Sequence, residues 1–126
     1  MPTPVNPIQS FTISLSDETS DLETGTAVTY FRLPFGFTLL EIPRASVSTA
    51  PVGSTVIVDI NVSGSTILST KLSIDASEKT STTAATPAVL SSKVFADDVD
   101  ITFDIDQVGS STAGKGLKCT LIGMQT

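Results

Sequence analysis

The stretch D-D-V-D-I-T-F-D-I-D-Q-V-G, residues 97–109, alternates between acidic and apolar side chains along almost its whole length. Alternation with a period of two predicts a β-strand with one face toward a core and the other toward solvent. We expect the apolar side chains to point mostly inward and the acidic side chains outward. The inward set is Val99, Ile101, Phe103, Ile105 and Val108, and the outward set is Asp98, Asp100, Thr102, Asp104 and Asp106.

Other parts of the chain repeat this pattern over shorter lengths. Residues 8–15 alternate, and in residues 55–62 four aliphatic side chains share one face while Asp59 and Asn61 point the other way. Ser63 and Gly64 supply a turn, since glycine tolerates a positive φ. Further strands are expected at 26–34, at 37–49 (with Pro43 marking an edge or a bulge), within 65–74, at 88–90 and at 117–124.

About eight short strands at turn spacings of about 8–12 residues are typical of a sandwich or barrel. No run is long enough for the helix of a βαβ unit. The sequence therefore predicts an all-β fold, an antiparallel β-sandwich of jelly-roll type. Its 126 residues suffice for one domain. We expect that domain to span residues 8–126, preceded by an extended proline-rich arm, residues 1–7, whose Pro2, Pro4 and Pro7 are candidates for contact with a partner.

Charge and composition exclude several functions. The net charge is −6 and the chain has no histidine. An acidic chain without a basic patch is a poor ligand for nucleic acid and is repelled by anionic membranes. Without histidine the commonest general base and metal ligand are missing. The single cysteine, Cys119, excludes an intrachain disulfide and shares its parity with Leu117 and Leu121, so we expect a small buried hydrophobe. We therefore expect no enzyme activity and no cofactor.

The segment G-S-S-T-A-G-K-G, residues 109–116, is close to the phosphate-binding pattern G-x-x-x-x-G-K-[ST]. A phosphate-binding loop needs a serine or threonine after the lysine and a helix whose N-terminus receives the phosphates. Gly116 follows Lys115 instead, and the residues after it are strand-like. We interpret the segment as a flexible hairpin loop.

Four aspartates of the acidic row, Asp98, Asp100, Asp104 and Asp106, raise the question of a calcium site. Successive residues on one face of a strand lie roughly 7 Å apart, too far for two neighbours to share a small cation unaided. Calcium would need further oxygens from a loop or another chain. The favoured interpretation is a solvated face whose like charges discourage edge-to-edge aggregation, with weak calcium binding as the alternative.

Aromatic residues gather around residues 30–37. Phe35 and Phe37 are candidates for an interface, although packing in the core is the favoured interpretation. The chain has no tryptophan, and aromatic residues make up 6% of it. This composition disfavours a sugar-binding platform.

A longer ordered pattern carries a resemblance. Its pieces are F-R-L-P (31–34), R-A-S-V-S-T-A-P-V-G-S (44–54), V-D-I-N (58–61), S-T-I-L-S-T-K-L-S-I-D (65–75), I-T-F-D-I-D-Q-V-G-S (101–110) and A-G-K-G-L-K (113–118). Over about residues 30–123 the chain resembles small β-domain structural proteins of tailed bacteriophages, which are abundant in marine and cyanobacterial phages. It departs mildly in the fourth piece and at Phe103.

The resemblance implies a structural role in the virion and offers no catalytic residues. A chain of this size favours a capsid decoration (cement) protein, made in the cytoplasm of the bacterial host and bound to the capsid surface. The partners implied are the major capsid protein and further copies of the chain, as a homo-oligomer expected to be a trimer. The alternative is a tail-fibre or knob module that contacts the host surface, including its glycans. A fibre needs an attachment stalk, for which residues 1–29 are short.

Overall fold

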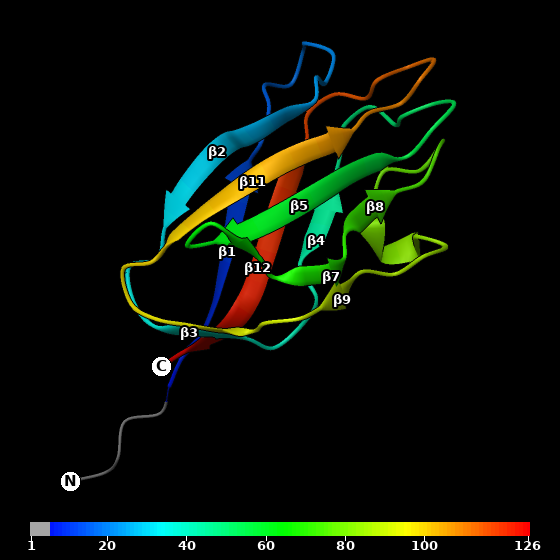
Figure 1. The fold of residues 1–126 in the computed structure, drawn as a ribbon. Coiled ribbons are helices and arrows are strands. Elements are labelled where there is room, and N and C mark those ends of the chain that lie inside the picture. Colours follow the sequence, from blue (N-terminus) through cyan, green and yellow to red (C-terminus); the bar gives the residue numbers. More distant parts are fainter. Residues whose placement is uncertain (1–5) are drawn as a thin grey trace, which may run out of the picture.

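The computed structural model describes residues 6–126, which form two antiparallel β-sheets packed face to face (Figure 1). The first sheet consists of β1 (Ile8–Ser14), β12 (Lys118–Gln125), β3 (Phe37–Leu39), β10 (Val94–Phe95) and β4 (Arg44–Ser46). The second sheet consists of β2 (Gly25–Arg32), β11 (Asp100–Gln107), β5 (Val56–Val62), β6 (Ser65–Thr66) and β8 (Leu72–Ile74). A separate pair, β7 (Leu68–Thr70) and β9 (Val89–Leu90), and a short 3₁₀ helix, η1 (Ser81–Thr83), complete the described part. The predicted all-β sandwich is confirmed.

The order of the strands is that of a jelly roll. Neighbours in the first sheet run β1–β12–β3–β10, and neighbours in the second run β2–β11–β5–β8. Strands that follow each other in the chain, such as β1 and β2 or β11 and β12, therefore lie in opposite sheets (Figure 1). Two Greek keys wound in this way produce the jelly-roll arrangement.

The core lies between the two sheets and is built by the predicted alternation. On β11, Ile101 and Phe103 are fully buried and Ile105 is 3% exposed. Val56, Val58 and Ile60 of β5 are fully buried beside them, and Cys119 and Leu121 of β12 face them from the first sheet. Burial of each such side chain contributes about 1.5–3 kcal/mol to folding. Hydrophobic burial between the two layers therefore holds the sandwich together.

Three expectations about the strands need correction. Asp98 does not lie on the strand, because it occupies a turn with a φ of 64° and β11 begins only at Asp100. The strand expected at residues 37–49 is divided into β3 and β4, since the buried Pro43 between them has no N–H to donate to a ladder. The return segment 65–74 is likewise divided into β6, β7 and β8.

The loop of residues 109–116 also differs from the expected flexible hairpin. It connects β11 to β12 and so crosses between the sheets. Backbone hydrogen bonds tie it to residues 49–52, with Val52 N donating to Thr112 O (2.9 Å) and Lys115 N donating to Thr49 O (3.2 Å). The loop leads into β12 at Lys118, and no helix follows it to receive a phosphate.

None of the helical turns in the described residues is long and apolar enough to cross a membrane.

Candidate functional site

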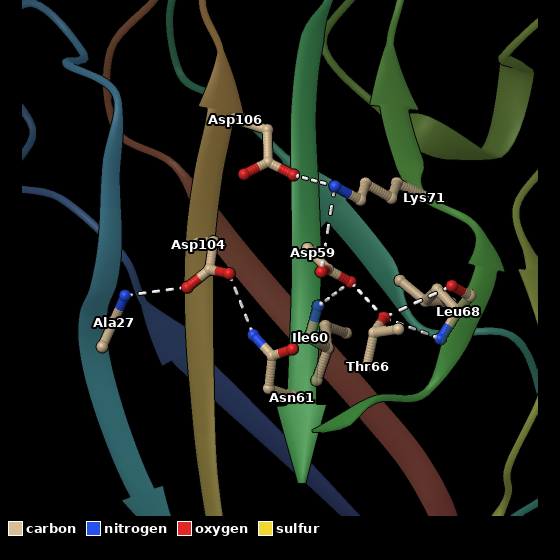
Figure 2. Close-up of polar contacts among 9 residues, drawn as sticks. All are labelled: Ala27, Asp59, Ile60, Asn61, Thr66, Leu68, Lys71, Asp104 and Asp106. Atoms are coloured by element: carbon tan, nitrogen blue, oxygen red, sulfur yellow. Dashed lines mark hydrogen bonds and ion pairs between the residues drawn. The ribbon is translucent and has the colours of Figure 1, made fainter. Parts of the chain in front are cut away.

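The polar residues of β5 and β11 meet on the outer face of the second sheet, which we call the polar face. The strands are in register with Asp104 opposite Asp59 and Thr102 opposite Asn61. Residues that are directly opposite each other in a sheet project to the same side. The hairpin after β5 returns along the same face and adds Thr66 and Lys71 (Figure 2).

Asp59 faces away from the core and is nevertheless buried, with only 6% of its surface exposed. Its carboxylate accepts a hydrogen bond of 2.5 Å from the Thr66 hydroxyl and one of 2.9 Å from the N–H of Ile60. The Thr66 hydroxyl in turn accepts the N–H of Leu68 at 3.1 Å. A buried carboxylate needs such donors to replace its lost hydration. Asp59 therefore joins the return segment of the hairpin to β5.

Asp104 joins the neighbouring strand to the same network. One carboxylate oxygen accepts the backbone N–H of Ala27 in β2 at 2.8 Å, and the other accepts the side-chain amide of Asn61 in β5 at 2.9 Å (Figure 2). Ala27 has a φ of 50°, and the register between β2 and β11 shifts at this point. Asp104 therefore satisfies a backbone group that the bulge in β2 removes from the sheet ladder.

Lys71 provides the positive charge of the polar face. Its ammonium group lies 2.5 Å from a carboxylate oxygen of Asp106 and 3.9 Å from one of Asp59. The hydrogen bond with Asp106 raises the pKa of Lys71 above its ordinary value. Sequence analysis did not single out Lys71 or Thr66, because the three short strands of the return segment give no clear alternation. Three carboxylates on one sheet face were the available signal that a cation should lie nearby.

The four candidate calcium ligands do not come together. Asp98 forms an ion pair with Arg32 at 3.3 Å, whereas Asp104 and Asp106 are bound to the residues just described. Asp100 is half-buried at the start of β11. Within residues 6–126, no group of three or more acidic, histidine or cysteine side chains is arranged to hold a metal ion.

The candidate interface residues are divided by the structure. Phe37 is fully buried in β3, so its assignment to an interface is wrong and the core interpretation holds. Phe35 is half-buried, with its ring centroid 5.8 Å from that of Phe11 and 6.5 Å from that of Phe37. Pro7 is exposed and its carbonyl accepts the N–H of Gln125 at 2.9 Å. Pro2 and Pro4 lie outside the described residues.

A groove of about 440 Å³ lies beside Lys71 at the end of the polar face. Hydroxyl side chains of β7, of β8 and of the loop residues Thr55 and Thr86 line most of it, together with Ile57, Lys71 and Asp75. It contains no aromatic ring on which a sugar could stack. The groove therefore has hydrogen-bonding groups but lacks the platform that glycan sites use.

The single cysteine does not contribute to the polar face or to the groove. Cys119 is fully buried in β12, and this burial raises the pKa of its thiol to about 12. A thiol that is both covered and protonated is a poor nucleophile. Its expected assignment to the core is confirmed.

No family model, no curated protein and no solved structure matches this chain. The assignment of a function therefore depends on the residues themselves.

Proposed function

We propose that this protein is a non-enzymatic structural component of a tailed-bacteriophage particle, a decoration protein that binds the outside of the head and stabilises it. The observation that carries the proposal is the ordered series of sequence pieces in which the chain resembles phage β-domain proteins. These pieces make up most of β5, the hairpin after it, β11 and the loop that leads into β12. They thus form one continuous part of the fold.

The roles of the side chains in these pieces agree with a structural protein. Asp59, Asn61 and Asp104 bind other strands, and the charge of Asp106 is balanced by Lys71. Such groups hold a surface rigid, and a rigid surface loses little conformational entropy when it binds a partner. A decoration protein that bridges neighbouring capsid subunits stabilises the shell by mass action.

The proposal is tested by adding the purified protein to heads that lack it. We expect saturable binding to the heads, measured by co-sedimentation, and a higher temperature for the release of packaged DNA. Heads of an unrelated phage serve as the control. Absence of binding to heads lacking the protein would contradict a decoration role.

The alternative is a tail-fibre or knob module that contacts the host surface. The groove beside Lys71 is the feature that favours it, since its hydroxyl and charged groups could bind a glycan. In that case the protein alone would bind host cells and not heads. Binding to cells that is lost when Lys71 is replaced by methionine would support this second function.

A further inference from the structure

β1 forms one edge of the first sheet, and its backbone pairs with β12 on one side only. Leu15 N donates to Leu117 O at 2.8 Å, and Gln125 N donates to Pro7 O at 2.9 Å. The odd-numbered residues of β1 therefore direct their N–H and C=O groups toward β12. Because these groups alternate along an antiparallel strand, Ile8, Ser10, Thr12 and Ser14 direct theirs away from the sheet.

In three of these four residues, the outward backbone groups are available for hydrogen bonds with a further strand. The hydroxyl of Thr29 donates to the carbonyl of Ser14 at 2.9 Å and covers that end of the edge. No strand of the described residues pairs with Ile8, Ser10 or Thr12 on the outer side. Their side chains are exposed, and Ile8 has 68% of its surface accessible.

The other sheet edges are short or interrupted. β10 and β6 have two residues each, and β8 has three. β2 is longer, but it bulges at Ala27, where the N–H binds the Asp104 side chain. Short strands, bulges and charges are the usual devices that prevent the pairing of sheet edges. Among the described edge strands, β1 is the one that is long, regular and free of charged side chains.

The distribution of charge identifies the partner that this edge suits. The chain has a net charge of −6, yet its first sixteen residues contain no charged side chain and Asp17 is the first. Two acidic copies repel each other, and the repulsion is smallest where neither copy presents a charge. An uncharged edge on an acidic protein is therefore suited to contact with a second copy of the same protein.

We propose that β1 pairs antiparallel with β1 of a second copy, centred on Ser10. Ser10 then lies opposite Ser10 of the second copy, and Ile8 lies opposite Thr12. These three residue pairs form about six backbone hydrogen bonds, two for each pair. The first sheets of the two copies become one continuous sheet across a two-fold axis, which is the symmetry of an isologous dimer.

This inference does not depend on the proposed role in a phage particle. It differs from the trimer implied by the family resemblance, because a two-fold contact closes with two copies. The molar mass in solution distinguishes the two. A dimer has about 26 kDa, twice the 13.1 kDa of one chain.

The test uses the symmetry of the pairing. Ser10→Lys and Ser10→Glu each bring two like charges directly opposite each other, which destabilises a cross-strand pair. The Ser10 hydroxyl makes no hydrogen bond within residues 6–126 and its side chain is exposed, so we expect both variants to fold. Light scattering after size exclusion at about 100 µM, above a micromolar Kd, should give a dimer for the wild type and monomers for each variant. An equimolar mixture of the two variants should return to the dimer mass.

Ser65→Lys is the matched control, because it places a lysine at an exposed position of the edge strand β6. It should remain dimeric. Hydrogen exchange of the wild type provides a measurement without variants: the amides of Ser10 and Thr12 should be protected at high concentration and exchange faster on dilution. A monomeric or trimeric wild type, or a dimer of Ser10→Lys, would overturn the proposal. Protection of these amides only on phage heads would also overturn it and assign the edge to a segment of another protein.

Discussion

The Asp104 carboxylate in β11 accepts the backbone N–H of Ala27 at 2.8 Å, across 77 residues of sequence. Ala27 has a φ of 50°, a left-handed conformation that a residue with a Cβ rarely adopts. The hydrogen bond therefore holds a strained bulge at the edge of the second sheet. This bulge interrupts β2, whereas β1 at the edge of the first sheet stays regular.

Replacement of Asp104 by alanine should destabilise the protein. The change removes the acceptor for Ala27 and for the Asn61 amide, and loss of these two bonds should lower the free energy of unfolding by about 1–2 kcal/mol. Urea denaturation measures the change. Asp100→Ala is the control on the same strand, since within residues 6–126 the Asp100 side chain makes no hydrogen bond or ion pair, whereas its backbone carbonyl accepts the N–H of Ser63 (3.0 Å). It should change stability by less than about 0.5 kcal/mol. Equal effects of the two substitutions would contradict the assigned role.

Thr66→Val tests the buried carboxylate of Asp59. Valine has nearly the shape of threonine but cannot donate, so Asp59 would stay buried with one fewer hydrogen bond. We expect a loss of about 1–3 kcal/mol in the free energy of unfolding. Thr102→Val makes the same chemical change on the same sheet face, where no hydrogen bond of the Thr102 hydroxyl occurs within the described residues, and should be nearly neutral. A neutral Thr66→Val would show that the 2.5 Å contact adds no stability.

The ion pair of Lys71 and Asp106 should make stability depend on alkaline pH. The pKa of Lys71 is raised in the folded state, so its stabilising contribution is complete below the ordinary lysine value of 10.5 and is lost as the pH rises through the higher folded value. Lys71→Met lacks this contribution at every pH. The difference in urea midpoint between wild type and Lys71→Met should therefore shrink above pH 10.5. A constant difference up to the highest pH studied would be inconsistent with this pair.

Cys119 should be unreactive toward a thiol reagent in the folded protein. Its side chain is fully buried and the pKa of its thiol is about 12, against 9.0 for an exposed thiol. The unfolded chain loses this proton at lower pH than the folded chain, so stability should also fall between pH 9 and 12. Ellman's reagent at pH 8 should label Cys119 rapidly in urea and slowly without it. Rapid labelling of the native protein would mean that β12 is accessible.

The proline-rich arm is expected to contribute to head binding. Residues 2–6 can be deleted without removing Pro7, whose carbonyl holds Gln125 of β12. We expect the deletion to leave the melting temperature nearly unchanged and to lower the occupancy of the protein on heads, measured by co-sedimentation. Full occupancy after the deletion would show that the arm does not contribute to head binding.

Sequence alone predicted the long strands well and the polar face poorly. In β11 the alternation of Ile101, Phe103 and Ile105 with polar residues identified both faces, because the pattern spans the whole strand. The same alternation was extended back to Asp98, which lies in a left-handed turn before the strand begins at Asp100. Local pattern does not show where a strand begins when the flanking residues continue its parity.

The burial of Asp59 could not be predicted from its own neighbourhood. Its parity correctly directed the side chain away from the core, but Thr66 and Lys71 cover it from the return segment. The burial of Phe37 agrees with the favoured interpretation of core packing, whereas its alternative assignment to an interface is excluded only by the closed sandwich, in which β3 directs the ring into the core. The cover of Asp59 and the burial of Phe37 both depend on segments that come together through the winding of the chain.

The copy number of this protein in purified virions tests the central proposal most directly. Quantitative mass spectrometry against the major capsid protein gives it without any assumption about the interface. A decoration protein on the head should be present in numbers comparable with the capsid protein. A copy number far below that would contradict decoration and favour a tail component, and absence from the particles would contradict a virion role altogether.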